Sequence, residues 1–364
     1  MKRRKKIVLV VGEGKQEVYG QLISMLKEKF FVQELYAAGE KPGFFAVRMV
    51  SFARAFSLLA RKLNPDIILV LGGPLISSWT AVFLVRFLGM KKKIIVYRHD
   101  IEHFRYFPRS PRYWLGHISA LMLERFCLTG ADSIIHKGLG EELKFLGFYG
   151  RIRDKPHFLF RNFLRPDYAV KKPKAKLSSV DGEFHLAYAG SIYTESTPFA
   201  DSLWEFYPKV TSQKIHFHLY SDASPMIRER LLEASRKDPY FHYEGSLPHK
   251  RLIAELSKYD YGTTMDGWYR KPGRKSYFLM TTFGNKTFDY MGARIPVICS
   301  RDMKATADFI NAHGIGFDID CSNISELKAV LSGKRKHYGS MVRNIDKAIA
   351  RLSSGSKFLR FVGS

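Results

Sequence analysis

Short apolar runs of strand length alternate with amphipathic stretches of helical length along the first part of the chain. The runs are continuous rather than alternating, which is typical of parallel strands that are covered on both faces. The predicted strands are residues 7–11, 67–71, 93–98 and 132–137, and the predicted helices are residues 16–29, 45–63, 78–88 and 111–128. This order predicts a Rossmann-like α/β domain.

The apolar pattern stops in "AVKKPKAKLSSVDGE", residues 169–183, where Lys, Pro, Ser and Gly predict a linker. It then restarts with predicted strands at residues 184–190, 215–221, 241–245, 259–265, 295–300 and 314–320. We therefore predict an acceptor-binding domain at 1–170, a linker at 171–183, a nucleotide-sugar-binding domain at 184–338 and a helical tail at 339–364. The helical spacing of the tail would let it pack on either domain, and its C-terminal helix could cross back to the first domain.

Two Rossmann-like domains place the carboxyl ends of both sheets toward a shared cleft, where open α/β sheets bind ligands. The first strand is followed by "GEGKQE" instead of GxGxxG, which argues against a dinucleotide dehydrogenase. The sequence has no HExxH motif, no Walker A motif and no Ser/His/Asp order, so hydrolase and ATPase functions have no support from motifs.

One uncharged stretch resembles a membrane span, and the basic N-terminus resembles the start of a signal peptide. Residues 67–85 carry no charge, but Gly72-Gly73-Pro74 in their middle predicts a strand, a turn and a helix rather than a span. The N-terminal "MKRRKK" precedes an apolar run that ends at Gly12, which predicts a basic tail and a strand rather than a signal peptide. The three cysteines lack metal-binding spacing and fit a reducing compartment.

The formal net charge is +25, and residues 1–180 carry 33 of the 59 Lys and Arg but only 14 of the 34 Asp and Glu. Such an excess attracts anionic membrane surfaces or nucleic acid. Residues 103–117 interleave aromatics with arginines, and residues 44–63 predict a basic amphipathic helix. Both features suit a bilayer headgroup region, although stacking on nucleic acid or plain core packing of the helix would also explain them. The predicted acceptor- or membrane-facing residues are Arg105, Arg109, Arg112 and Trp114.

The segment "GNKTFDYMGARIPVICS", residues 284–300, predicts a short helix before a buried strand. Asn285 suits the N-cap, and Lys286 would add a positive charge where helix amides suit a phosphate. Asp289, one turn further on the same side, could accept hydrogen bonds from a ribose diol. The alternative is a surface ion pair between Lys286 and Asp289 on a capped helix.

This segment resembles the "P-x-K-x-F-E-Y-x-A-x-G-x-P-V-I" signature of GT-B glycosyltransferases of the group 1, family 4-like type. Further segments resemble the family in its own order: "NPDIILVLGGP", "KIIVYRHDIEHF", "LMLERFCLTGADSIIHKG", "HFLFRNFLRPDY", "FHLAYAGSIY", "FHLYSDASPMIRERL" and "FHYEGSLPHKRLIAELSKYDYGTTM". The resemblance covers most of the chain and implies the GT-B fold, in which two Rossmann-like domains face a cleft.

The resemblance also implies roles for particular residues. His99 matches the histidine that approaches the donor sugar, and Asp100 follows it as in the family's His-Asp pair; a buried structural histidine is the alternative. The residues that match the donor-binding positions are Gly190, Ser191, Leu247, Pro248, Asn285, Lys286, Thr287 and Asp289.

The sequence departs from the family at the donor site. Asp289 stands where the family has Glu, and Thr281 stands where it has a second acidic residue. Tyr193, Thr194 and Glu195 replace the usual Arg and Lys. A basic loop at residues 266–283 could supply the positive charge that offsets the diphosphate. The alternative is a basic loop that is only solvated and has no contact with a ligand. The predicted phosphate-binding residues of this loop are Arg270, Arg274 and Lys275, with Lys271 beside them.

The sequence thus favours a glycosyltransferase that needs no metal or other cofactor. Its resemblance implies a nucleotide-sugar donor, a saccharide or lipid-linked acceptor such as a cell-envelope glycan precursor, and retention of anomeric configuration. We expect a cytoplasmic protein, peripheral on the inner membrane face, without a nucleic-acid partner. A sugar-nucleotide epimerase of the same fold, a non-catalytic GT-B binding protein and a nucleic-acid-binding protein remain the alternative hypotheses.

Overall fold

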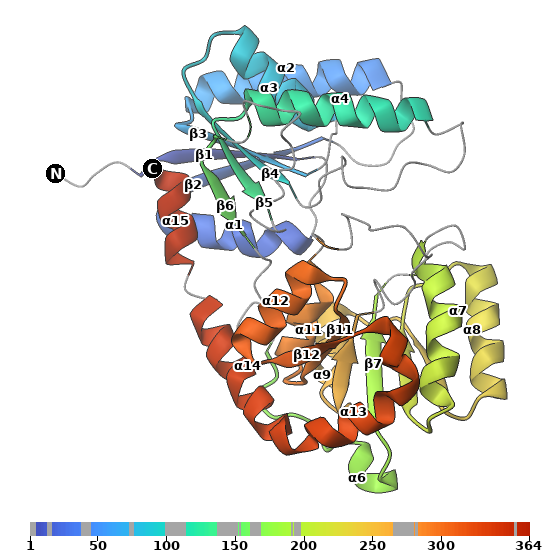
Figure 1. Ribbon diagram of the computed structural model, residues 1–364. Helices are drawn as coiled ribbons and strands as arrows, with labels where there is room; N and C mark the ends of the chain where they lie inside the picture. Colours follow the sequence, from blue (N-terminus) through green and yellow to red (C-terminus); the bar gives the residue numbers. More distant parts are fainter. Residues whose placement is uncertain are drawn as a thin grey trace. The chain divides into compact units, whose positions relative to one another are not determined.

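Two compact α/β units make up the chain in the computed structural model (Figure 1). One unit contains residues 1–162 and 355–364, and the other contains residues 163–354. The structure describes residues 5–12, 17–37, 45–72, 76–98, 114–136, 152, 154–160, 169–190, 192, 198–264, 280, 283–352 and 355–364.

The first unit is built on a parallel sheet with the strand order β2-β1-β3-β4-β5-β6. Its strands are β1 (Ile7–Gly12), β2 (Phe31–Tyr36), β3 (Ile67–Leu71), β4 (Lys93–Arg98), β5 (Ser133–His136) and β6 (His157–Leu159). Its helices are α1 (Glu17–Lys29), α2 (Phe45–Leu63), α3 (Ile76–Phe87), α4 (Trp114–Gly130) and α15 (Ser356–Gly363). Helices α2, α3 and α4 pack side by side on one face, and α1 and α15 cover the other (Figure 1).

The uncharged stretch at residues 67–85 forms the buried strand β3 and the helix α3, as predicted. Among the described residues, no helix is long and apolar enough to cross a bilayer. Strands β2 and β6 were not predicted, because Gln33 and Glu34 interrupt the apolar residues of β2 and β6 has only three residues; both are edge strands. An edge strand keeps one side exposed and therefore does not need the apolar residues that make a central strand recognisable.

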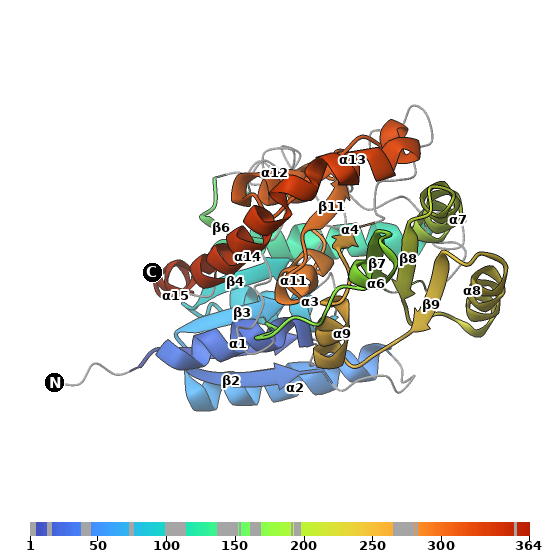
Figure 2. The same cartoon turned by 90° about the horizontal axis from the view of Figure 1, so that it is seen from below.

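The second unit has a parallel sheet with the order β12-β11-β10-β7-β8-β9. Figure 2 labels β11, β7, β8 and β9 of this sheet. Its strands are β7 (His185–Ala189), β8 (His216–Tyr220), β9 (Phe241–Gly245), β10 (Tyr261–Thr263), β11 (Val297–Ser300) and β12 (Gly316–Ile319). Its helices are α6 (Ser178–Asp181), α7 (Pro198–Thr211), α8 (Pro225–Lys237), α9 (His249–Leu256), α11 (Lys286–Gly292), α12 (Lys304–His313), α13 (Leu327–Lys334) and α14 (Tyr338–Leu352), with 3-10 turns η5 (Cys321–Glu326) and η6 (Arg335–His337).

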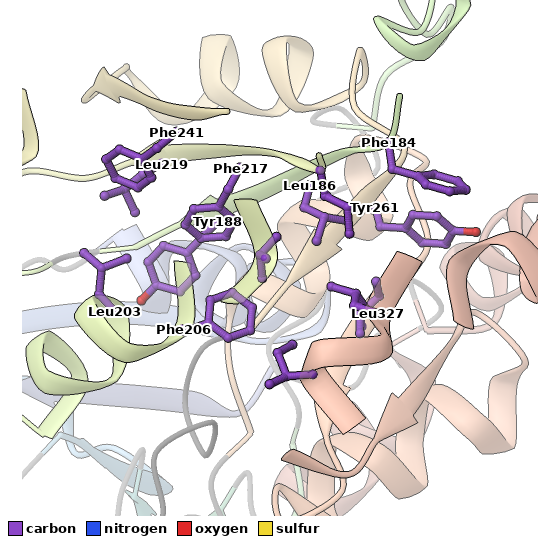
Figure 3. Close-up of a cluster of buried hydrophobic side chains, with 14 of the residues drawn as sticks. Phe184, Leu186, Tyr188, Leu203, Phe206, Phe217, Leu219, Phe241, Tyr261 and Leu327 are labelled. Carbon is purple, nitrogen blue, oxygen red and sulfur yellow. The ribbon is translucent and has the colours of Figure 1, made fainter. Parts of the chain in front are cut away.

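A large apolar core lies on one face of this second sheet (Figure 3). Leu186 and Tyr188 of β7 and Phe217 and Leu219 of β8 alternate with residues that point to the opposite face. Helix α7 contributes Leu203 and Phe206 to the cluster, and helix α13 contributes Leu327. The fold class predicted from the apolar pattern, two parallel sheets flanked by helices, is confirmed.

The predicted linker and tail are both folded segments. Within residues 171–183, the Lys174 amide donates to Ser257 Oγ, and Lys176 Nζ donates to the carbonyls of Ser257 and Tyr259. The segment therefore lies on the second unit. The predicted single tail divides in two, because α14 packs in the second unit, whereas Phe358 of α15 contacts Phe160 in the first.

Gly316 of β12 lies directly opposite Val297 of β11 and leaves no room for a side chain. A Cβ at this position would clash with the Val297 backbone, which cannot move without breaking the sheet. We expect Gly316→Ala to lower the free energy of unfolding of the second unit by about 2–3 kcal/mol, measured by urea denaturation. Gly333→Ala on α13 is the control, since nothing lies within 4 Å of a Cβ there. Equal stabilities of the two variants would contradict this packing argument.

Candidate functional site

The topology of the second sheet places a switch point between β7 and β10. From β7 the chain proceeds to β8 and β9 on one side, and then returns to β10 and β11 on the other. In open α/β sheets, ligands bind at the carboxyl ends of the strands where the order reverses in this way. Gly190 directly follows β7, and helix α11 follows β10 in the chain, so both lie at this edge.

Tyr290 of α11 joins the two strands at the switch point. Its hydroxyl accepts a hydrogen bond from the Ala189 amide at 3.1 Å and donates one to the Thr263 carbonyl at 2.8 Å. Burial raises the pKa of Tyr290, which keeps the hydroxyl protonated as this donor role requires. The ring packs where a side chain at Gly262 would lie. Sequence analysis missed Tyr290, although its place in the segment "TFDYMG" on α11 could have identified it.

Lys286, at the first position of α11, lies against the loop that follows β7. Its Nζ sits over the Tyr188 ring at 4.9 Å from the centroid, a cation–π distance. A Cβ at Gly190 would lie 3.0 Å from Lys286 Nζ and 2.8 Å from the Tyr188 hydroxyl. The structure therefore brings together two predicted donor-site residues that are distant in sequence, and the glycine is what allows them to approach.

Asp289 is paired with a histidine rather than with Lys286. His249 Nε2 lies 2.7 Å from Asp289 Oδ1, and the two side chains are 38% and 18% exposed. His249 begins helix α9 and directly follows the predicted residues Leu247 and Pro248. Sequence analysis missed this histidine, although its position next to "LP" in "GSLPHK" could have drawn attention to it.

The imidazole of His249 restrains the Asp289 carboxylate but leaves it able to accept further hydrogen bonds. A carboxylate has two oxygens and about four lone-pair directions, of which the contact with His249 uses one. Asp289 can therefore accept further hydrogen bonds from a ligand while His249 holds it in place. The surface ion pair with Lys286, the alternative considered from the sequence, is replaced by the contact with His249.

The start of α11 differs in detail from the sequence prediction. Asn285 stands at the N-cap position, but its side chain makes no capping hydrogen bond, because its backbone is already helical. The amides of Thr287 and Phe288 donate to the carbonyls of Gly284 and Asn285, so neither is available to a phosphate. Thr287 is fully buried, and its hydroxyl lies inside the unit. Among the described residues that were predicted to face the phosphate at the start of α11, the half-buried Lys286 is thus the best placed.

Leu247 is partly exposed and Pro248 exposed, and both lie in the loop between β9 and α9. Trp114, predicted to face an acceptor or membrane, begins α4 and is exposed. The other predicted site residues lie outside the described part of the chain: His99, Asp100, Arg105, Arg109, Arg112, Ser191, Arg270, Arg274 and Lys275.

The described residues also line a cavity of about 440 Å³ in the second unit. It lies at the amino-terminal ends of the strands, where Phe184 precedes β7 and Tyr261 begins β10. No predicted donor-site residue lines it. The candidate site therefore rests on the topology and on the contacts of Lys286 and Asp289 rather than on this cavity.

Gly190→Ala tests the contact between the β7 loop and α11. The added methyl group would displace the flexible end of Lys286 and would also press against the buried Tyr188 hydroxyl, so we expect a loss of stability of about 1–2 kcal/mol. Displacement of the lysine should weaken the binding of a nucleoside diphosphate roughly tenfold or more, measured by isothermal titration calorimetry. Gly333→Ala on α13, where nothing lies within 4 Å of an added Cβ, is the control for a substitution away from this contact. If Gly190→Ala binds the nucleoside diphosphate as tightly as the wild type does, Lys286 does not contact this ligand.

A comparison with known protein families found a match in the C-terminal half of the chain. Residues 199–362 match the family model of the glucosyltransferase 3-like C-terminal domain. This segment includes His249, Lys286, Asp289 and Tyr290 but not Gly190. Among curated proteins, none matches the sequence.

Solved structures of similar architecture cover almost the whole chain. The lipopolysaccharide outer core galactosyltransferase WaaB has a TM-score of 0.64 at 12% identity, with 97% of this chain and 99% of that chain covered. Anabaena HepE, solved with UDP and glucose, has a TM-score of 0.57 at 14% identity, with 96% and 95% covered. A UDP-N-acetylglucosamine 2-epimerase has a TM-score of 0.57 at 13% identity, with 93% and 91% covered. These likenesses show the fold, and it is the fold that the sequence resemblance implied.

Proposed function

We propose that this chain, which has the GT-B fold, is a glycosyltransferase that moves a sugar from a nucleotide-sugar donor to a saccharide or lipid-linked acceptor. The observation that carries the proposal is the corner at the β7/β10 switch point, where Lys286 meets Gly190 and Asp289 meets His249. The match of residues 199–362 to a glucosyltransferase-like domain supports transfer as the reaction class.

In this proposal each side chain of the corner has a distinct task. Asp289, oriented by His249, accepts hydrogen bonds from the ribose hydroxyls of the donor. Lys286 balances the diphosphate, which becomes more negative at the leaving oxygen as the glycosidic bond breaks. Its contact with the Tyr188 ring restrains the long side chain, so less conformational entropy is lost when the donor binds.

The remaining roles follow the sequence resemblance. We propose that His99, with Asp100, acts at the donor sugar and that Arg270, Arg274 and Lys275 add to the charge that faces the diphosphate. Gly190 and Ser191 would border the diphosphate, and Leu247 and Pro248 the base. Cations of the protein would then offset the leaving group, in a transfer that needs no catalytic metal and retains the anomeric configuration.

A nucleotide screen tests the donor site. UDP, GDP, ADP and CMP are added separately to the full chain, and the thermal unfolding midpoint is measured. A nucleotide at 100 times its dissociation constant should stabilise the protein by about 2.7 kcal/mol. We expect UDP to give the largest shift, since the similar HepE structure contains UDP. If none of the four raises the midpoint, the donor-site assignment is wrong.

A sugar-nucleotide epimerase is the second candidate, because a structure of that activity shares the fold over nearly the whole chain. An epimerase converts the nucleotide-sugar without an acceptor, whereas a transferase releases the nucleoside diphosphate only when an acceptor is present. Incubation with UDP-sugars, with and without extracted lipid-linked saccharides, separates the two by the products that form. A GT-B protein that only binds would give the thermal shift but neither product.

We further propose that the first unit attaches to an anionic membrane surface from the cytoplasmic side. Its helical face carries exposed apolar side chains on three adjacent helices. These residues are Val50 and Leu58 on α2, Phe87 on α3 and Trp114, Leu115, Ile118 and Met122 on α4. Exposed apolar groups on adjacent helices of a basic unit suit the headgroup region of a bilayer, and such attachment would bring the enzyme to a lipid-linked cell-envelope precursor.

Vesicle sedimentation tests this attachment. We expect the wild type to sediment with phosphatidylcholine vesicles that contain phosphatidylserine, and the bound fraction to fall with salt. Leu115→Glu together with Met122→Glu should reduce binding roughly tenfold or more, because two exposed apolar groups are replaced by charges that the membrane repels. Met226→Glu on α8, an exposed apolar position of the second unit, is the matched control. Equal vesicle binding by all variants would contradict the proposal that these residues contact the membrane.

A further inference from the structure

Four histidines form a ladder across β7, β8 and β9 in the second unit. His185 on β7 lies opposite His216 on β8, and His218 on β8 lies opposite His242 on β9. His216 and His218 are two positions apart, so all four rings lie on the same face of the sheet, away from the apolar core. His185 and His216 are the first residues of their strands, whereas the donor corner lies at the carboxyl ends.

One branch of the ladder runs between two carboxylates. Asp181 Oδ2 lies 3.0 Å from His185 Nε2, His185 Nδ1 lies 2.9 Å from His218 Nε2, and His218 Nδ1 lies 2.8 Å from Glu244 Oε1. Three hydrogen bonds need three protons, but two neutral imidazoles carry only two, and an ionised carboxylate carries none. With both carboxylates ionised, this branch therefore needs one additional positive charge.

A second branch leaves the same carboxylate oxygen. Asp181 Oδ2 lies 3.5 Å from His216 Nε2, and His216 Nδ1 lies 2.9 Å from His242 Nε2. The Nε2 atoms of His185 and His216 and the carboxylate oxygen of Asp181 all lie within 4.8 Å of one another. A positive charge placed between these three atoms would therefore contact both branches and would supply the charge that the first branch needs.

We propose that Asp181, His185 and His216 bind a divalent transition-metal ion of the Zn²⁺ class. Ligands at about 2.0–2.1 Å from a tetrahedral ion lie about 3.3 Å apart, close to the two separations from Asp181. Two imidazoles and a carboxylate are a ligand set that suits zinc. Water would complete the coordination, since the Asp181 side chain is 38% exposed.

The ion would also supply a role for seven of the eight ring nitrogens in the ladder. With Nε2 of His185 on the metal, its Nδ1–H donates to His218, and the Nδ1–H of His218 donates to Glu244. With Nε2 of His216 on the metal, its Nδ1–H donates to His242. Second contacts of this kind fix the tautomer and orientation of metal-binding histidines in proteins.

The ligand rings can reach the ion with a small rearrangement. His185 and His216 are stacked, with ring centroids 4.5 Å apart and an angle of 9° between the planes. The χ2 torsion of histidine is soft, so a rotation turns both Nε2 lone pairs toward one point. Because Asp181 lies on α6 and the histidines lie on β7 and β8, the ion would hold α6 to the edge of the sheet. This site is separate from the proposed transfer reaction and has a structural role.

Metal titration of the full chain tests the proposal. After dialysis against a chelator and removal of any histidine tag, Zn²⁺ is titrated by calorimetry, and Co²⁺ is used to follow the ligand-field spectrum. We expect one equivalent to bind, with a rise in the thermal midpoint. Asp181→Asn and His216→Gln should each weaken binding tenfold or more, and the Co²⁺ spectrum should change in both.

The exposed His337→Gln on η6 is the matched control and should bind Zn²⁺ as the wild type does. His216 is only half-buried, so its variant is expected to fold, which circular dichroism checks. The proposal is overturned if the wild type binds no stoichiometric Zn²⁺, in which case a proton supplies the additional charge. It is also overturned if both ligand variants bind as tightly as His337→Gln.

Discussion

Asp289→Ala is expected to remove most of the stabilisation that the donor nucleotide gives to the protein. Loss of a charge-assisted hydrogen bond to a ligand weakens binding by roughly 1.5–3 kcal/mol, which is about 10- to 100-fold. At a concentration of 100 times the wild-type dissociation constant, stabilisation should fall from about 2.7 kcal/mol to as little as about 0.4 kcal/mol. Thermal unfolding with and without the nucleotide measures this difference directly.

Two further variants show whether the effect belongs to the proposed ribose site. Asp308→Ala on α12 removes an exposed carboxylate that pairs with Lys304, and it should respond to the nucleotide as the wild type does. His249→Ala should weaken binding less than Asp289→Ala, because it removes the group that orients the carboxylate and leaves the carboxylate itself. A normal response of Asp289→Ala to the nucleotide would refute its role as the ribose acceptor.

Glu124→Ala is expected to lower the free energy of unfolding of the first unit by about 3–5 kcal/mol. Glu124 of α4 forms an ion pair with Arg98 at the end of β4, and both side chains are almost completely buried, at 0% and 2% exposure. Arg98 Nη1 also donates to the Gly72 carbonyl at 2.8 Å. Removal of the carboxylate takes away a buried countercharge of the guanidinium, which is costly in a medium of low polarity.

Urea denaturation, followed by a probe in the first unit, measures this loss. Glu28→Ala on α1 is the control, because Glu28 is exposed and its removal should change stability by less than about 0.5 kcal/mol. The double variant Arg98→Met with Glu124→Leu should recover much of the lost stability, since apolar residues of similar size can replace a buried ion pair. A loss below about 1 kcal/mol in Glu124→Ala would mean that water reaches the pair.

The buried pair also bears on the proposed catalytic residues. Arg98 directly precedes His99 and Asp100 in the chain, so the contact with α4 fixes the end of the strand from which they continue. The sequence resemblance included Glu124 within "LMLERFCLTGADSIIHKG", but neither spacing nor charge could reveal its partner. Residues that are distant in sequence can pair in many ways, and packing selects one of them.

The central strands were predictable because each is a continuous apolar run between turn-forming residues. Strands β1, β3, β4 and β5 lie where these runs occur, and the six strands of the second sheet lie where strands were predicted from less continuous apolar segments. The sequence indicated that a C-terminal helix could cross back to the first domain, which α15 confirms, but the point at which the tail divides was not predictable. Its helical spacing describes which face is apolar, but α14 and α15 bury their apolar faces against different units.

The sequence by itself determined the two-sheet architecture and the segment of the donor corner, since periodicity and local motifs depend on neighbouring residues. Only the tertiary structure decided what Asp289 and Lys286 contact. His249 and Gly190 come from other strand–helix connections and meet α11 only because the sheet order reverses between β7 and β10. The histidine ladder likewise depends on strand register, which aligns residues from three strands that local sequence patterns leave unrelated.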